Sequence, residues 1–302
     1  MKALTLFFSI VCLFLFSCKK SHQNNNTAKP KMYQLSYSVS SFSQQIIPIK
    51  NAAGQKTNSL AVNASLKDSL DVLYFYLYDS QNKLYDTLTQ TSSYSYPFGT
   101  IRDSVAAGAY TVVFMGIKDV EAVNGYKVNG PTVSRTTALL SWPEVFSKKI
   151  AINVSASTPN QHLVLDRVVG QIQVNIQDAL PSNYASVKAQ LPGDSTYYAI
   201  YNPTNPTGVG DAIYNRTISA QERAASPPFQ FSFFTRQFSS PFTLTLSFYD
   251  AQGTLLFTKA IPNVTCKQNT RTILTGKLVS NTSSNFQITF NSDWGSVNNM
   301  PF

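Results

Sequence analysis

Apolar and polar residues alternate with a period of two through most of the chain beyond residue 32. A period of two puts neighbouring side chains on opposite faces of a strand, so these segments are predicted to be strands with one buried and one wetter face. This pattern is typical of antiparallel sheets. Short helical turns are expected at Ser182–Gln190 and Ser219–Ala225. The clearest strand segments are Leu73–Tyr78, Tyr110–Met115, Val168–Gln177, Phe229–Phe233, Phe242–Tyr249 and Phe286–Phe290.

Two of these segments assign residues to faces in detail. In Leu73–Tyr78, the two leucines and the phenylalanine fall on one face and the three tyrosines on the other. In Tyr110–Met115, Tyr110, Val112 and Phe114 oppose Thr111, Val113 and Met115. Each of the two segments is expected to have one buried face and one wetter face.

Two stretches about 170 residues apart resemble each other. Val72–Thr87 and Leu244–Thr258 both read as an aromatic-rich strand, Tyr-Asp, a polar turn and a second strand. Asp79 and Asp250 suit the turns because their carboxylates accept backbone N–H groups. The similarity suggests two related domains; the alternative is that any two hairpins look alike.

Composition supports an all-β chain of 302 residues, long enough for two domains. Charged residues make up 13% and aromatic residues 13%, which suits sheets with one wet face rather than a helical bundle. A polar stretch at Ser155–Gln161 suggests the boundary. We therefore expect an N-terminal β-sandwich over residues 33–157 and a C-terminal β-sandwich over residues 158–302.

The net charge of +9 does not indicate a nucleic-acid partner. Five of the 24 basic residues lie in the first 31 positions, where no acidic residue occurs, which leaves 19 basic against 15 acidic residues. The body of the chain is therefore only mildly basic.

The N-terminus has the form of a lipoprotein leader. Residues 1–17 join a short positive start to an apolar stretch too short for a comfortable transmembrane helix, and they end at Leu15-Phe16-Ser17 before Cys18. This sequence resembles the bacterial lipobox and implies cleavage before Cys18 and its lipidation; the alternative is an ordinary signal peptide with a chance cysteine. Residues 18–32 are predicted to be a flexible tether whose lysines lie against anionic head groups or serve solubility.

Nothing in the sequence indicates an enzyme, a cofactor or a metal site. After loss of the leader and acylation of Cys18, Cys266 has no cysteine with which to form an intramolecular disulfide. His22 lies in the tether and His162 at the head of a strand, and neither has a Cys or His neighbour at metal-ligand spacing. The carboxylates are expected to cap turns, as at Asp79, Asp86, Asp178 and Asp250.

Two groups of residues leave a carbohydrate role open. Trp142 and Trp294 have rings that stack on sugars, although core packing is the more common use. Four Asp-Ser or Asp-Thr pairs match a pattern linked with O-glycosylation in Bacteroidota; chance matches are the alternative in a chain rich in Ser and Thr. Their hydroxyl residues are Ser69, Thr87, Ser104 and Ser195.

Three stretches resemble the fimbrillin and fimbrial-anchor (type V pilus) superfamily of Bacteroidota. The resemblance implies a lipoprotein of two transthyretin-like, antiparallel β-sandwiches that binds other fimbrial subunits by strand addition. The stretches are Leu73–Leu84 followed by Ala107–Val113, Leu165–Ile172, and Asn269–Leu278 with a final strand at Phe286–Trp294.

The resemblance also suggests which subunit this is. Stalk subunits of that superfamily are cut after an Arg near the N-terminus, and here the first Arg is Arg102. A subunit that keeps its lipid, the anchor, is therefore favoured. The tail Gly295–Phe302 or the first strand Tyr33–Val39 are candidates for strand exchange; the alternatives are a frayed end and an ordinary edge strand.

The sequence thus predicts a non-enzymatic outer-membrane lipoprotein that acts in fimbrial assembly or anchoring, and so in adhesion. Whether it faces outward or into the periplasm stays open. The alternative is a surface lipoprotein that binds host or surface glycans or another ligand and has no role in a pilus.

Overall fold

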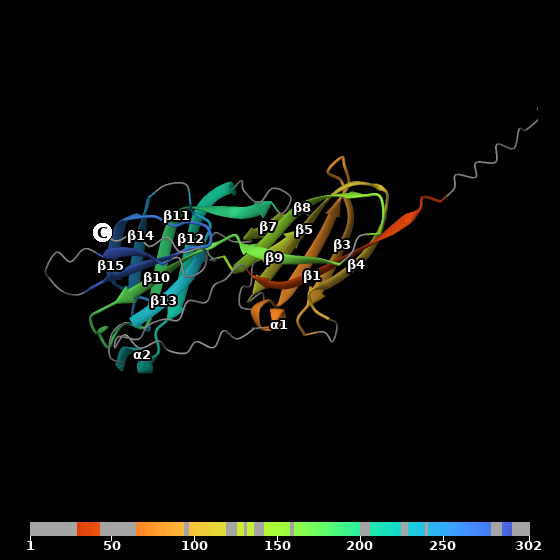
Figure 1. The fold of residues 1–302 in the computed structure, drawn as a ribbon. Coiled ribbons are helices and arrows are strands. Elements are labelled where there is room, and N and C mark those ends of the chain that lie inside the picture. Colours follow the sequence, from red (N-terminus) through yellow and green to blue (C-terminus); the bar gives the residue numbers. More distant parts are fainter. Residues whose placement is uncertain are drawn as a thin grey trace, which may run out of the picture. The chain divides into compact units, whose positions relative to one another are not determined.

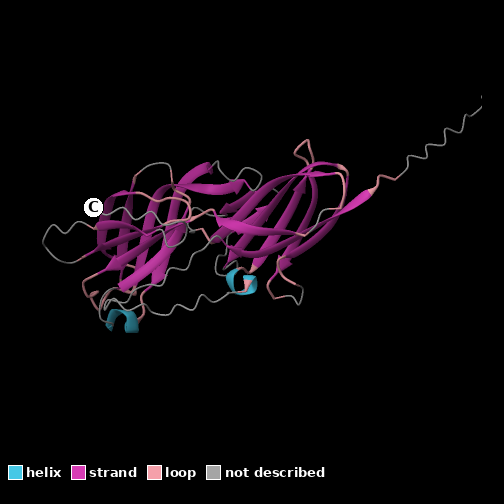
Figure 2. Cartoon of the chain, in the orientation of Figure 1, coloured by secondary structure: helices cyan, strands magenta, loops and turns pink. Residues whose placement is uncertain are grey.

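The computed structural model of the chain consists almost wholly of strands (Figure 2). Short helices and turns connect them. The residues that the structure describes are 29–42, 65–93, 97–118, 126–129, 132–135, 142–157, 160–199, 206–224, 229–238, 241–278 and 286–291. Among these residues, neither helix has the length and apolar character needed to cross a membrane.

The N-terminal sandwich is built on one seven-stranded sheet that folds over itself, in the order β3-β2-β5-β8-β9-β1-β4 (Figure 1). Every neighbouring pair is antiparallel except β1 and β9, which are parallel. The elements are β1 (Met32–Phe42), α1 (Leu66–Ser69), β2 (Val72–Tyr78), β3 (Leu84–Thr91), β4 (Thr100–Ala106), β5 (Gly108–Lys118), β8 (Glu144–Val154) and β9 (Gln161–Arg167).

The C-terminal sandwich has two sheets, β13-β10-β16-β17 and β15-β14-β11-β7-β6, and β12 pairs with β11. Here the parallel pair is β10 with β16. The elements are β6 (Tyr126–Asn129), β7 (Thr132–Arg135), β10 (Gly170–Ile176), β11 (Ser186–Ala199), β12 (Pro206–Thr217), α2 (Ala220–Ala224), β13 (Phe229–Thr235), β14 (Phe242–Tyr249), β15 (Leu255–Val264), β16 (Arg271–Gly276) and β17 (Gln287–Asn291).

Most strand pairs of the first sandwich recur in the second, although the β8–β9 and β16–β17 pairs have no counterpart among the described strands. In the first, β1 pairs with β4 and β9, β2 with β3 and β5, and β5 with β8. In the second, β10 pairs with β13 and β16, β11 with β12 and β14, and β14 with β15. The predicted pair of β-sandwiches is confirmed, with one parallel strand pair in each as a departure from a purely antiparallel arrangement.

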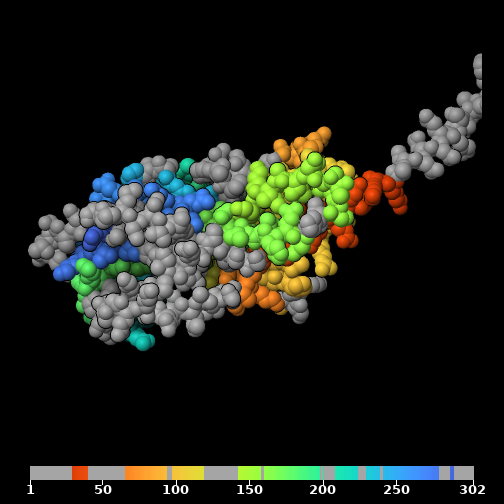
Figure 3. Space-filling view, viewed as in Figure 1, coloured from red at the N-terminus to blue at the C-terminus, as the bar shows by residue number. Residues whose placement is uncertain are grey.

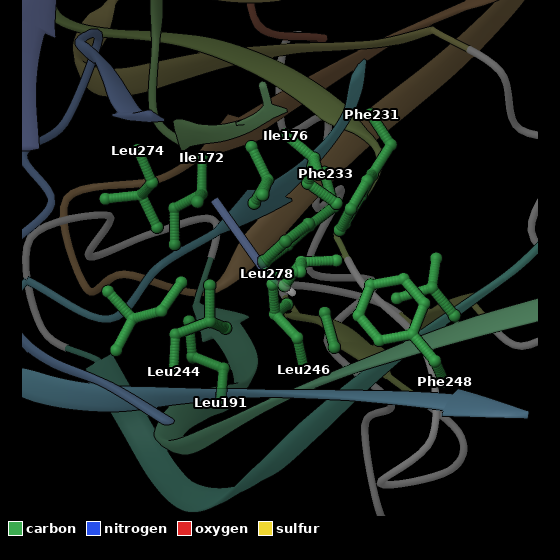
Figure 4. Packing of buried hydrophobic residues seen from close by; sticks show 14 of the residues in the cluster. Ile172, Ile176, Leu191, Phe231, Phe233, Leu244, Leu246, Phe248, Leu274 and Leu278 are labelled. Atoms are coloured by element: carbon green, nitrogen blue, oxygen red, sulfur yellow. The ribbon is translucent and has the colours of Figure 1, made fainter. Parts of the chain in front are cut away.

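Alternating apolar residues fill each sandwich, as the period of two predicts. Figure 4 shows the C-terminal core, where Ile172 and Ile176 of β10 face Leu244, Leu246 and Phe248 of β14. The N-terminal core gathers Leu35, Tyr37, Phe75, Phe114 and Leu165 among others. Both cores are independent hydrophobic clusters, which is what two sandwiches require.

The sequence assigned a wetter face to β2 and β5, and there the prediction is wrong. Tyr76 and Tyr78 are 4% and 2% exposed, and Val113 and Met115 are fully buried. These side chains form a third cluster with Trp142, Val145, Val168 and Val169. Tyrosine has an apolar ring and a polar hydroxyl, so a strand with tyrosines on its second face shows an alternating apolar and polar sequence pattern. Such a strand can nevertheless be buried on both faces.

The similar hairpins at Asp79 and Asp250 have matching turns. The Asp79 carboxylate accepts the N–H groups of Gln81 and Lys83 at 2.9 Å each. The Asp250 carboxylate accepts those of Gln252 and Thr254, at 3.0 and 2.7 Å. By topology, however, β2 corresponds to β11, and β14 corresponds to β5. The two hairpins therefore occupy different places in the repeat. The alternative, that unrelated hairpins look alike, explains this similarity.

The change from one sandwich to the other falls at Val168 and Val169 rather than in the polar stretch Ser155–Gln161. β9 pairs with β1 and β8, so residues 161–167 belong by strand pairing to the N-terminal sandwich. Both valines are buried, at 5% and 0% exposure. The polar stretch is the connection between β8 and β9. A two-residue apolar linker has no compositional signal, because packing rather than flexibility joins the domains.

The β5–β8 connection and the helical turns also differ from expectation in part. β6 and β7 lie between β5 and β8 in sequence, but β7 pairs with β11 of the C-terminal sandwich and β6 pairs with β7. The turn predicted at Ser219–Ala225 is present as α2. The one predicted at Ser182–Gln190 is present only at residues 182–183, where the N–H of Tyr184 donates to the carbonyl of Pro181 at 3.0 Å; from Ser186 the backbone belongs to β11 and pairs with β12 and β14.

Candidate interaction surfaces

Several predicted site residues lie outside the described residues. These are the lipidation candidate Cys18, the leader, His22, Trp294 and the tail Gly295–Phe302. The structure therefore bears on the body of the chain, and the lipid anchor stays a prediction from sequence.

The first strand is central rather than at an edge. β1 pairs with β4 on one side and with β9 on the other. Leu35, Tyr37 and Val39 are at most 4% exposed and belong to the N-terminal core. The sequence left two alternatives for this segment, strand exchange and an ordinary edge strand. Neither fits, because β1 has a neighbouring strand on both sides and its apolar side chains pack in the core.

Trp142 does not offer its ring to a sugar. Its side chain is 1% exposed, and its Nε1 donates to the carbonyl of Ser195 at 3.2 Å. The guanidinium of Arg236 lies 5.7 Å from the ring centre. The ring therefore serves the junction between the sandwiches, as the core-packing alternative anticipated.

The four hydroxyls in the glycosylation pattern have different environments. Ser195 is 2% exposed and sits on β11, so a sugar there requires unfolding. Thr87 is exposed, but its hydroxyl donates to the carbonyl of Phe75 at 3.1 Å. Ser104 is exposed on β4, and Ser69 is half-buried at the end of α1. Of the four, Ser104 is the most accessible.

The carboxylates mostly serve the backbone. Asp178 accepts the N–H of Leu278 through both oxygens, at 2.9 and 3.1 Å, in addition to the turns at Asp79 and Asp250. Asp86, in contrast, lies within β3 and not in a turn.

His162 is exposed on β9, and β8 and β9 form much of the surface seen in Figure 3. Within the described ranges, no three His, Cys, Asp or Glu side chains group as metal ligands.

Cys266 is a core residue. Burial raises the pKa of its thiol to about 12, and Gly170 lies so close that an added Cβ would meet the Cys266 sulfur at 2.4 Å. A thiol of that pKa is uncharged near neutrality and is not a nucleophile.

Two edges of the described sheets are protected in ordinary ways. β15 carries Lys259 and Pro262 and has two register shifts against β14, all of which discourage pairing with another strand. The side chain of Arg216 on β12 reaches β13 and donates to the carbonyl of Gln230 at 2.8 Å.

The flank between β3 and β4, the two ends of the seven-stranded sheet, is more open. β3 has eight residues and neither Lys, Arg nor Pro. Leu84, Tyr85 and Leu88 are 38%, 48% and 37% exposed. Exposed apolar side chains on an edge strand without such residues mark a surface able to accept another strand.

Two carboxyl groups meet at this flank. Asp86 lies opposite Leu77, and Asp103 lies opposite Leu35, so both are on the core-facing side of their strands. The pKa of Asp103 is raised, first by burial and further by its interaction with the carboxyl group of Asp86. Burial and the charge of Asp103 raise the pKa of Tyr37 to about 12. Sequence reasoning placed Asp86 in a turn and passed over Asp103, because the register that faces them is a tertiary property.

The fold resembles solved structures from Bacteroides and Porphyromonas. A candidate polysaccharide-binding protein from Bacteroides thetaiotaomicron has a TM-score of 0.55 and 11% identity, covering 87% of this chain and 96% of that chain. A candidate adhesin from Bacteroides ovatus has a TM-score of 0.49 and 12% identity, covering 86% and 93%. The fimbrial anchor protein Mfa2 from Porphyromonas gingivalis has a TM-score of 0.45 and 12% identity, covering 87% and 98%.

No family model matches the sequence, and no curated protein matches it either. At 11% identity, the likeness to the Bacteroides thetaiotaomicron structure shows a shared fold across nearly the whole of both chains. The two-sandwich architecture is therefore established for this chain by its own strand pairing and by this likeness.

Proposed function

We propose that this two-sandwich chain is a lipid-anchored outer-membrane protein that acts as an anchor or subunit of a fimbria. Cys18 carries the lipid, residues 18–32 form the tether, and exposed sheet edges make strand contacts with other subunits. The role is structural and adhesive rather than enzymatic. Which face of the membrane the protein occupies is decided by export and not by the fold.

The observation that carries the proposal is the combination of a lipobox-like leader with an edge strand, β3, that has exposed apolar side chains and no Lys, Arg or Pro. The first supplies attachment, since one or two acyl chains anchor a protein without a spanning helix. The second supplies polymer contacts, because an added strand gains main-chain hydrogen bonds along the edge. The stretches that resemble the fimbrillin and fimbrial-anchor superfamily support the same role.

Replacement of Cys18 tests the anchor. We expect Cys18→Ala to move the protein from the membrane fraction to the soluble fraction and to remove the acyl mass from the intact protein. Cys12→Ala, which changes a cysteine within the predicted leader, is the matched control and should leave the protein in the membrane. Retention of the Cys18→Ala protein with membranes would contradict the lipid anchor.

Filament co-purification tests the fimbrial role separately. We expect the protein to appear at the base or along the length of sheared surface filaments in immunogold images. A strain that lacks the protein should release its filaments into the medium if the protein is the anchor. Filaments that remain attached and unchanged in number would refute the anchor role.

A second candidate is glycan binding, favoured by the description of the Bacteroides thetaiotaomicron structure as a candidate polysaccharide-binding protein. The exposed ring of Tyr85 is the aromatic group best placed for it, since Trp142 is buried. Binding to a glycan array that is lost in Tyr85→Ala and kept in Tyr85→Phe would favour this candidate over the fimbrial one.

A further inference from the structure

Each sandwich has a flank between two topologically equivalent strands. Among the described residues, one of the two flanks lacks a cation that the other has. By topology, β3 corresponds to β12 and β4 to β13. β3 and β4 are the two ends of the seven-stranded sheet, whereas β13 ends one C-terminal sheet and β12 pairs with β11 of the other. The same chain therefore provides two solutions for covering the same position.

The C-terminal flank is covered by aromatic rings and one arginine. The ring of Tyr214 on β12 stacks on Phe231 and Phe233 of β13, with ring centres 6.1 and 5.3 Å apart. Arg216, two residues further along β12, lies 5.4 Å from the ring centre of Phe229 and donates to the carbonyl of Gln230. Apolar surface and a cation thus seal this flank.

The N-terminal flank is covered at only one end. Gln90 of β3 bridges to β4, donating to the carbonyl of Thr100 at 2.7 Å and accepting the N–H of Gly99 at 2.8 Å. Further along the same face of β3 come Leu88, which is 37% exposed, and Asp86. The ring of Tyr85 on β3 packs edge-on against Tyr110, with ring centres 5.6 Å apart, but among the described residues no cation pairs with Asp86 or Asp103 as Arg216 pairs with Glu222 in the other sandwich.

The carboxylates at this end are held by their own strands and form no ion pair with any of the residues that the structure describes. One oxygen of Asp86 accepts the N–H of Thr87 at 2.7 Å, and one oxygen of Asp103 accepts the N–H of Ser104 at 2.6 Å. The second oxygen of Asp103 is buried and has no hydrogen-bond partner within the described structure, and the same is true of the buried hydroxyl of Tyr37. A buried acceptor without a donor costs stability, so the site is incomplete as it stands.

We propose that the flank between β3 and β4 binds an extended segment of a second protein, which pairs with the edge of β3 and places a Lys or Arg over Asp86 and Asp103. An apolar side chain two positions from that basic residue covers Leu88, which shares the face of Asp86. The segment supplies to the N-terminal sandwich the cation that Arg216 supplies to the C-terminal one. This inference deepens the proposed function by naming the edge and the chemistry of the partner strand.

The test compares two synthetic peptides of about nine residues, the length of an ordinary strand. Both alternate valine on one face with threonine on the other and carry a fluorescent label; the central residue of the valine face is Lys in one and Glu in the other. We expect the full-length protein to bind the Lys peptide about tenfold more tightly than the Glu peptide, measured by fluorescence anisotropy at low salt. Hydrogen exchange of alternate amides in β3 should slow when the Lys peptide is bound.

Variants separate the carboxyl pair from general electrostatics. In the double variant Asp86→Asn/Asp103→Asn, the two peptides should bind with nearly equal affinity. The matched control Asp211→Asn/Asp250→Asn removes the same charge elsewhere and should keep the preference for Lys. A Lys peptide N-methylated on alternate backbone amides should not bind, because it cannot form the ladder. Equal binding of both peptides to the unchanged protein, or an unchanged preference in the flank variant, overturns the proposal.

A metal ion is the competing occupant of the carboxyl pair. If calcium alone raises the unfolding temperature of the unchanged protein but not of Asp86→Asn/Asp103→Asn, and neither peptide binds, the flank is a cation site and the proposal is overturned. These results are independent of the fractionation of Cys18→Ala and of filament attachment, so the failure of one proposal is distinguishable from the failure of the other.

Discussion

At the scale of single residues, the N-terminal sandwich carries an unfavourable group near its surface. Asp103 is on the core-facing side of β4, and burial together with Asp86 raises its pKa. Inward-pointing charge on an edge strand is one way in which proteins discourage uncontrolled strand pairing. The cost is that the isolated protein is less stable than it would be with an uncharged side chain there.

The effect of Asp103 on stability should depend on pH. Because its pKa is higher in the folded protein than the ordinary 3.8, the folded state takes up the proton first as pH falls. Asp103→Asn should therefore be more stable than the unchanged protein at pH 7, by on the order of 0.5–1 kcal/mol. The difference should shrink as pH falls through the folded pKa and vanish near the ordinary value.

Denaturant unfolding at neutral and acidic pH measures this difference. Asp211→Asn, which alters an exposed carboxylate on β12, serves as the control and should show little change at either pH. A destabilised Asp103→Asn at pH 7 would mean that the carboxylate has a stabilising partner and that the flank is not incomplete.

At the scale of elements, hairpin turns are specified locally. Asp250 holds its turn by accepting two backbone N–H groups, and Gly253 has φ +80°, where a side chain would be strained. Asn82 takes the corresponding place after Asp79, with φ 63°. Because every contact in these turns is within five residues, the sequence alone predicted them. The pairing partners of each hairpin were not predictable in the same way.

Loss of one turn carboxylate should destabilise the C-terminal sandwich. We expect Asp250→Ala to lower the free energy of unfolding by about 1–2 kcal/mol, since two charge-assisted hydrogen bonds to exposed backbone are lost. Asp250→Asn retains an acceptor and should lose less than half as much. Chemical denaturation of both variants checks the order, and an Ala variant as stable as the Asn variant would show that the turn is held by its backbone alone.

At the scale of the whole molecule, two sandwiches are joined by a two-residue linker and a packed junction. Arg167 forms an ion pair with Glu144, with 2.6 Å between nitrogen and oxygen, and donates to Asn269 of the second sandwich at 3.0 Å. Arg236 of the second sandwich donates to the carbonyl of Val168 at 2.7 Å. The hydrogen bond from Trp142 to the carbonyl of Ser195 adds a further contact between residues of the two sandwiches.

Removing the ring of Trp142 should uncouple the two sandwiches. We expect Trp142→Ala to cost about 3–5 kcal/mol, the usual range for a large buried aromatic side chain. Unfolding should change from one transition to two, which tryptophan-independent circular dichroism and calorimetry can follow. Trp142→Phe keeps most of the apolar contact and should keep a single transition. A single transition in Trp142→Ala would show that the linker and the arginines couple the sandwiches without the ring.

By itself, the sequence determined the fold class, most of the strands and the polar turns, because each depends on periodicity or on neighbours a few residues apart. From the sequence we did not predict that the change between sandwiches falls at Val168 and Val169, that Tyr76 and Tyr78 are buried, or that β1 lies between two other strands. Those features depend on which distant strands pair and on what covers the second face of a sheet. Register across the fold also decides that Asp86 and Asp103 face one flank. Only the tertiary structure could show that carboxylates 17 positions apart meet where the other sandwich has an arginine and stacked rings.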